Sequence, residues 1–222
     1  MGDGRPAAVL TGAPLDRSFF ARPTVEVARD LLGCRLVVDP GTPDAVVATL
    51  VEVEAYLGLE DPASHAHRGP TPRAAIMFGP AGHLYVYLSY GVHHCANLVT
   101  EVDGVAGAVL LRSAHVESGH DVVHRRRAAV ASRRAPLAAA AARVIPAHEL
   151  LRGPGNLCRG LGIDLRDNGD DVSSRASRVE VWPAERRPRV ARGPRVGITR
   201  AADRPLRFAW RDHPAVSRPP LG

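Results

Sequence analysis

The chain has 222 residues, of which 45% are hydrophobic and 23% charged, so it can bury one sizeable core and is not a disordered protein. Its formal net charge is +6 and it contains no lysine, which favours an anionic partner and excludes any mechanism that needs a lysine amine. No run approaches the roughly 18 apolar residues that cross a bilayer, so we expect a cytoplasmic protein without membrane contact.

The first elements in the chain are a helix at residues 23–32 and a strand after Gly33. Residues 46–58 are rich in β-branched side chains and predict a longer strand. Alternation along that strand places Glu52, Glu54 and Tyr56 on one face, opposite an apolar face. A solvated face of an amphipathic strand would also explain this pattern, so the two carboxylates alone do not define a site.

Residues 58–83 are rich in Gly, Pro and His and predict a long loop, with one helical turn at residues 73–77. Strands are expected at 84–91, 106–114 and 179–184, and no alternation of strands and helices suggests a parallel sheet. The glycine-rich run at 152–163 lacks the order of a phosphate-binding loop and predicts a tight turn before a short helix.

The expected organisation is a flexible N-terminus at 1–14, a single domain at 15–214 and a C-terminal tail at 215–222. Within the domain, residues 118–147 form an Ala/Arg-rich insert that is either a basic helix pair or a partly disordered segment. Its arginines would add nonspecific affinity for nucleic acid; they are Arg125, Arg126, Arg127, Arg133 and Arg134.

Aromatic residues make up only 5% of the chain, yet three of its four tyrosines lie within residues 83–94. Tyr85 and Tyr87 share a strand face, which ordinary β-propensity can explain. Tyr90 precedes Gly91, where the strand should turn, and an aromatic side chain there can stack on or wedge between bases.

Other polar residues allow more than one interpretation. His65 suits the wall of a pocket, and Arg112, at the end of an apolar strand, needs an acidic partner or substrate if it is buried. His65 and the other histidines near it in the sequence, His67, His93 and His94, fit no standard four-ligand spacing together with Cys95, so we expect no metal. The three cysteines are far apart in the sequence and are expected to be ordinary thiols.

Five stretches resemble, in the same order, the alkyladenine (3-methyladenine) DNA glycosylase family that lacks the helix-hairpin-helix motif. They are FFARPTVEVARDLLGCRLV, the long block from VEVEAYLG to CANLVT, AVLLRSA, RGPGNLCRGLGID and PRVGITRAADRPLRF. The resemblance implies an α+β fold, a single domain with a curved, mostly antiparallel β-sheet surrounded by helices.

The resemblance also implies a role for each candidate residue. Glu54 matches the general base that activates water for attack on the deoxyribose, and Arg112 matches the residue that helps to hold this water. The residues that match the walls of a pocket for a flipped base are Tyr56, His65, Tyr87 and Asn97. Tyr90 matches the residue that intercalates into DNA, whereas Glu52 has no assigned role beyond structure.

The implied protein is a monofunctional hydrolase that acts on duplex DNA containing damaged purines, as a monomer and without cofactor or metal. The absence of a side-chain amine agrees with base release that stops at an abasic site. Two alternatives stay open: a nonenzymatic nucleic-acid-binding module with a tyrosine stacking platform, and a hydrolase of small nucleosides. The basic charge argues against the nucleoside hydrolase. If the chain is bacterial, we expect the implied DNA glycosylase to be associated with the nucleoid.

Overall fold

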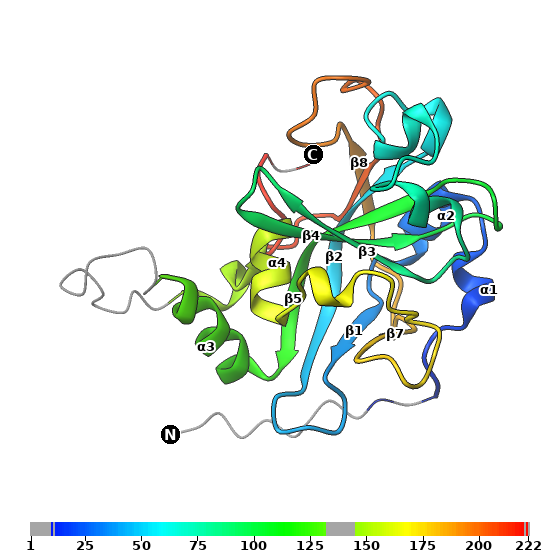
Figure 1. Ribbon diagram of the computed structural model, residues 1–222. Helices are drawn as coiled ribbons and strands as arrows, with labels where there is room; N and C mark the ends of the chain where they lie inside the picture. Colours follow the sequence, from blue (N-terminus) through cyan, green and yellow to red (C-terminus); the bar gives the residue numbers. More distant parts are fainter. Residues whose placement is uncertain (1–9, 11, 132–144, 220, 222) are drawn as a thin grey trace.

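The computed structural model describes residues 10, 12–131, 145–219 and 221. Its main feature is an antiparallel sheet with the strand order β3-β4-β5-β2-β1-β7, to which β6, β8 and β9 add at the sides. The strands are β1 Arg35–Val38, β2 Val46–Tyr56, β3 Leu84–Ser89, β4 His93–Val99, β5 Ala108–Ser118, β6 Leu151–Arg152, β7 Val179–Trp182, β8 Val190–Gly193 and β9 Arg207–Trp210. The sheet is strongly curled, so that β3 and β4 run across the direction of β2 (Figure 1).

Helices cover the sheet, and the predicted α+β class is confirmed. The α-helices are α1 Arg17–Phe20, α2 Thr24–Asp30, α3 His120–Ala131 and α4 Pro154–Leu161. Alternate residues of β1 and β2, such as Leu36 and Leu50, pack with Val27 of α2 and Leu157 of α4 in the main core. Because this core takes one face of these strands, their other face is left for polar side chains.

Most of the predicted elements are present. The expected helix at 23–32 is α2, and the five expected strands correspond to β1, β2, β3, β5 and β7, of which β5 is longer than expected. The loop at 58–83 contains three 3₁₀ turns, Gly58–Glu60, His65–Arg68 and Ala75–Phe78, the last of which lies close to the expected turn. The short helix after the glycine-rich turn is α4, which begins after Gly153 at φ +89°.

Strands β4, β6, β8 and β9 were not predicted. β4 begins with His93, His94 and Cys95, a polar start that hides the strand pattern, and it pairs with β3 in a hairpin. Residues 215–217, which the sequence assigns to a tail, are buried: Ala215 is 0% exposed, Val216 8% and Ser217 7%. Ser217 among them donates its backbone N–H to Glu52 of β2.

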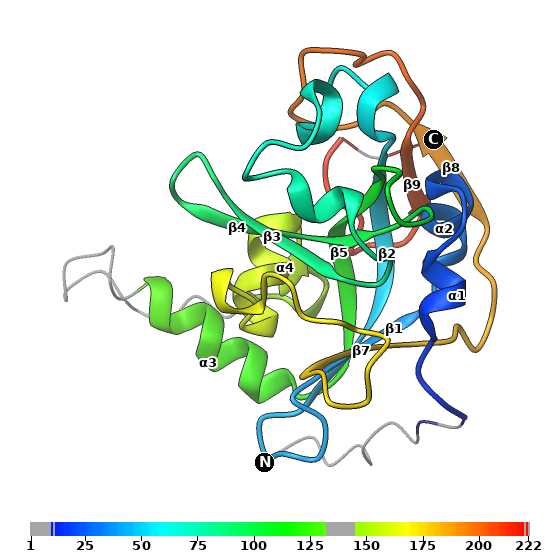
Figure 2. The ribbon, with the colours of Figure 1, turned by 45° about the vertical axis from the view of Figure 1, so that its right-hand side comes forward.

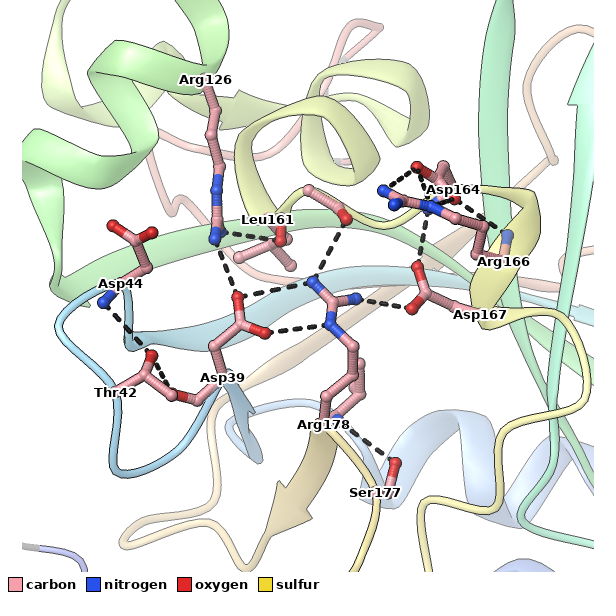
Figure 3. A network of polar contacts seen from close by, with 12 residues as sticks. Asp39, Thr42, Asp44, Arg126, Leu161, Asp164, Arg166, Asp167, Ser177 and Arg178 are labelled. Atoms are coloured by element: carbon pink, nitrogen blue, oxygen red, sulfur yellow. Dashed lines mark hydrogen bonds and ion pairs between the residues drawn. The ribbon is translucent and has the colours of Figure 1, made fainter.

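An arginine network holds α3 against the sheet (Figure 3). Arg178 donates to Asp39 and Asp167, and Arg126 of α3 donates to Asp39 and to the carbonyl oxygen of Leu161. Arg127 donates to the carbonyl oxygens of Glu149 and Leu150. Two of the arginines expected to contact nucleic acid therefore support the fold, while Arg133 and Arg134 lie outside the described residues. Among the residues described, no helix has the length and apolar character needed to cross a membrane.

Candidate active site

Both glutamates of β2 lie in the protein interior. Glu52 and Glu54 are each 0% exposed, so the interpretation of a solvated strand face is wrong. The pairing of β2 with β5 shifts register on either side of Glu52, which marks a bulge in the strand. Ionised groups so deeply buried need partners, and each glutamate has its own set.

Glu54 accepts two hydrogen bonds and forms one ion pair. Its Oε1 receives the backbone N–H of Val196 at 2.7 Å and lies 3.2 Å from Nη1 of Arg112. Its Oε2 receives the hydroxyl of Tyr56 at 3.0 Å. Burial raises the pKa of Glu54 above its ordinary value, against the opposing effects of Arg112, the Val196 N–H and the Tyr56 hydroxyl. A buried carboxylate with a raised pKa is a stronger proton acceptor than an ordinary glutamate.

Glu52 is held by five hydrogen bonds. Arg112, Arg207 and Ser113 donate side-chain groups to it at 2.8 Å, and Ser217 donates its backbone N–H at 2.7 Å and its hydroxyl at 2.8 Å. Burial alone would raise the pKa of Glu52, but Arg112, Arg207 and the Ser217 N–H outweigh it and hold the pKa below its ordinary value. Glu52 is therefore a fixed anion.

Arg112 of β5 connects the two carboxylates. Its Nε donates to Glu52 at 2.8 Å, its Nη1 faces Glu54, and its Nη2 donates to the hydroxyl of Ser217 at 3.1 Å. Its exposed fraction is only 5%, so the acidic partners required of a buried arginine are present. The guanidinium is thus fixed where it contacts Glu54 and can also donate a hydrogen bond to a molecule in the adjacent cavity.

A cavity of about 460 Å³ opens beside Glu54. It lies between the β3–β4 hairpin, the loop before it and residues 196–198. The predicted site residues that line it are Tyr56, His65, Tyr87, Tyr90, Asn97 and Arg112. Residues far apart in the sequence thus meet at one place. Glu54 does not itself line the cavity, but its carboxylate contacts three residues that do, Tyr56, Arg112 and Val196.

Three aromatic rings form one wall of this cavity. His65 contacts Tyr87 edge to face, with ring centroids 4.7 Å apart, and Tyr87 lies 5.4 Å from Tyr85. The Tyr85 hydroxyl is 2.8 Å from Nδ1 of His65. Burial and the charge of Arg73 lower the pKa of His65, which favours a neutral imidazole. Such a wall suits a flat, uncharged or cationic ring.

Tyr56 and Asn97 complete the pocket. The guanidinium of Arg195 lies over the Tyr56 ring at 4.5 Å and also binds both carboxylate oxygens of Asp61, so one face of the ring is fixed. The Asn97 side chain is 4% exposed, and its amide nitrogen donates to the carbonyl oxygen of Tyr85 at 3.0 Å. Both walls are therefore rigid.

Tyr90 lies at the tip of the β3–β4 hairpin. It is 90% exposed, has φ +49° and precedes Gly91 at φ +66°. Its neighbours Leu88 and Val92 are 39% and 43% exposed, so the tip as a whole is apolar. The hairpin extends away from the rest of the sheet, beside the cavity (Figure 2).

Several residues of the site were not singled out by the sequence. Arg207, Ser217 and Arg195 support Glu52 and Tyr56, and the backbone of Val196 binds Glu54. Except for Ser217, these residues lie in the stretch PRVGITRAADRPLRF, which carried part of the resemblance without an assigned role. A backbone donor leaves no mark in the residue type, so sequence alone does not reveal it.

The histidines and cysteines are not arranged as metal ligands in the part of the chain that the structure describes. His67 Nδ1 lies 2.8 Å from the carbonyl oxygen of Leu59, and the thiols of Cys34, Cys95 and Cys158 are free and buried. Within the described ranges, no group of three or more His, Cys, Asp or Glu side chains is arranged to hold a metal ion.

Comparison with known proteins identifies the family. Residues 18–214 match the methylpurine-DNA glycosylase family. This chain belongs to that family. A protein of Cutibacterium acnes is 47% identical over 206 residues, covering 90% of this chain and 97% of the relative. A protein of Mycobacterium sp. (strain KMS) is 49% identical over 195 residues, covering 86% of each chain, and one of Nitrobacter winogradskyi is 42% identical over 217 residues, covering 98% and 93%.

All three relatives carry the provisional name 3-methyladenine DNA glycosylase. Together with the family, they make this chain a DNA glycosylase, a hydrolase that acts on damaged bases in DNA. The alternatives of a nonenzymatic binding module and of a nucleoside hydrolase are therefore set aside.

Proposed function

We propose that the enzyme rotates a damaged purine out of duplex DNA into the cavity beside Glu54 and hydrolyses its N-glycosidic bond. The observation that carries the proposal is the buried carboxylate of Glu54, which is fixed by two hydrogen bonds and an ion pair from residues that line an aromatic pocket. Chemistry at a base inside a duplex requires extrusion of the nucleotide, and the cavity offers the extruded base a site next to the residues that contact Glu54.

Hydrolysis follows from the position of Glu54. As the bond between C1′ and the purine nitrogen breaks, the base takes the electron pair and positive charge develops on the sugar. Glu54 stabilises this charge and accepts a proton from the water that attacks C1′. Arg112, held by Glu52, helps to orient that water. The products are a free base and an abasic site.

The aromatic walls select for a damaged purine. The rings of Tyr56, His65 and Tyr87 offer stacking surfaces, and a desolvated aromatic face favours a cationic alkylated base by up to about 2 kcal/mol. We assign Asn97 to the exclusion of normal guanine, whose exocyclic amine would crowd it. One pocket binds one base, so a monomer is sufficient.

Substitution of Glu54 tests the proposal. Glu54→Gln keeps the shape of the side chain and removes the proton acceptor, so we expect release of 7-methylguanine from a lesion-bearing duplex to fall at least about 100-fold while binding to the duplex is retained. Base release is measured by chromatography under single-turnover conditions, and binding by fluorescence anisotropy. Glu60→Gln, the same change at an exposed glutamate in the neighbouring loop, is the control. Wild-type rates in Glu54→Gln would remove Glu54 from the mechanism.

A further inference from the structure

The pocket contains a second cation besides Arg112. The guanidinium of Arg73 lies over the ring of Tyr87, 4.8 Å from the centroid. Arg73 lies in the same loop as His65, at residues 58–83, and its side chain lines the same cavity as Tyr87 and Asn97. Nothing in the proposed hydrolysis uses it.

The two arginines differ in their surroundings. Arg112 is neutralised by ion pairs with Glu52 and Glu54. Arg73 is exposed, and none of the described residues that line the cavity is an aspartate or a glutamate. Its charge reaches into the pocket, because it lowers the pKa of His65 in addition to the effect of burial. The aromatic wall is thus already occupied on one side by a positive charge.

A positive charge at this position affects purines according to their own charge. A cationic base needs an aromatic face to compensate its charge, and Arg73 covers the face of Tyr87. If Arg73 moves aside but stays near the wall, it still repels a cation and leaves a neutral base unaffected. If it only filled space, it would hinder both kinds of base alike.

We propose that Arg73 is a specificity-determining residue that disfavours purines carrying a positive charge relative to neutral ones. The inference rests on the proposed function, because it concerns which bases the Glu54 pocket accepts. The preference of the aromatic walls for cations is thereby partly offset, so that neutral damaged purines compete better with alkylated ones.

The ratio of two release rates tests this proposal. Single-turnover rates are measured at saturating enzyme on matched duplexes with 7-methylguanine, which is cationic, or hypoxanthine, which is neutral. In Arg73→Gln, we expect the rate ratio of 7-methylguanine to hypoxanthine to rise roughly threefold or more over that of the wild type. A ratio cancels changes in folding and in general affinity for DNA.

Two control variants separate charge from size and from general attraction. Arg73→Lys keeps the positive charge and should leave the ratio within about twofold of the wild type. Arg68→Gln removes a charge from an exposed residue of the same loop that does not line the cavity, and it should also leave the ratio unchanged. An unchanged ratio in Arg73→Gln, or an equal rise in Arg73→Lys, would overturn the proposal. Release of neither base by the wild type would instead refute the proposed function.

Discussion

Glu52 and Glu54 are two residues apart on one strand, equally buried, and yet have opposite pKa shifts. Glu52 has two guanidiniums, two hydroxyls and a backbone N–H around it, whereas Glu54 shares one guanidinium and has a phenol and one N–H. The number of charged donors decides the sign, since burial raises the pKa of both. Glu52 is thereby kept as a fixed anion, and the raised pKa of Glu54 agrees with the proton-accepting role that we propose for it.

The opposite shifts predict opposite effects on stability. The pKa of Glu52 is lowered on folding, so its contribution is present above its ordinary pKa of 4.5 and is lost as the pH falls through the folded value. Glu52→Gln should lower the free energy of unfolding by roughly 3 to 5 kcal/mol at pH 7, because it leaves two buried guanidiniums without their shared anion. The difference from the wild type should shrink in acid.

Glu54 gives the matched comparison. Its pKa is raised on folding, so the wild type loses stability as the pH rises from 4.5 through the folded value. Glu54→Gln should therefore become more stable relative to the wild type over that range. Urea unfolding of both variants at about pH 4 and 7 provides the measurement. If both glutamine variants lost the same stability at both pH values, the assignment of different roles would fail.

The residue types of the site were predictable, but their partners were not. Glu54, Tyr56 and Tyr87 stood out because acidic and aromatic side chains are concentrated on two strands of a tyrosine-poor chain. The neighbouring Glu52 is held in the interior by Arg207 and Ser217, more than 150 residues further along the chain. No local pattern records a contact over that separation, which is why a solvated strand face was a reasonable alternative for Glu52.

At the scale of elements, the β3–β4 hairpin joins two functions. Its strands place Tyr87 and Asn97 in the pocket, and its turn places Tyr90 at an exposed tip. The turn needs two successive residues at positive φ, and Tyr90 takes this conformation at 49° next to Gly91. Such a conformation is uncommon for a bulky side chain, and its occurrence here supports a role for the exposed ring.

Removing the ring tests that role. We expect Tyr90→Ala to lower single-turnover release of 7-methylguanine from a duplex at least about fivefold, because one stacking contact contributes roughly 1 to 3 kcal/mol. The same variant should act normally on a lesion in single-stranded DNA, where no partner base must be separated. Tyr90→Phe keeps the ring and should retain most of the activity. Equal losses on duplex and single-stranded DNA would contradict a wedge.

The hairpin also shows where sequence reasoning stops. Its first strand was predicted from the alternation in LYVYLSYG, but its second begins with three polar or weakly apolar residues, HHC, and was not. Strand β4 forms because pairing with β3 and β5 supplies its hydrogen bonds. Short strands whose stability comes from their neighbours carry little signal of their own.

At the scale of the molecule, the last described residues of the chain help to hold β2, the strand that carries Glu52 and Glu54. Ser217 supplies two of the five hydrogen bonds to Glu52, accepts one from Arg112 and offers its carbonyl oxygen to Arg207 at 2.8 Å. The sequence around it, HPAVSRPP, has the composition of a tail, since Pro and Arg are typical of exposed termini. Ser217 is buried because it binds Glu52, Arg112 and Arg207, which lie far from it in the sequence or on another strand.

Truncation measures this dependence. A chain that ends at Pro214 loses Ser217 and the buried side chains of Ala215 and Val216, so we expect its free energy of unfolding to fall by at least about 3 kcal/mol, with loss of base release. A chain that ends at Pro219 keeps these residues and should lose much less stability. Urea unfolding and single-turnover release are measured on both.

Ser217→Ala in the 222-residue chain removes only the hydroxyl, and it should give an intermediate loss of stability, because the backbone N–H still binds Glu52. Equal stability of the chains that end at Pro214 and Pro219 would show that residues 215–217 have no part in fixing Glu52.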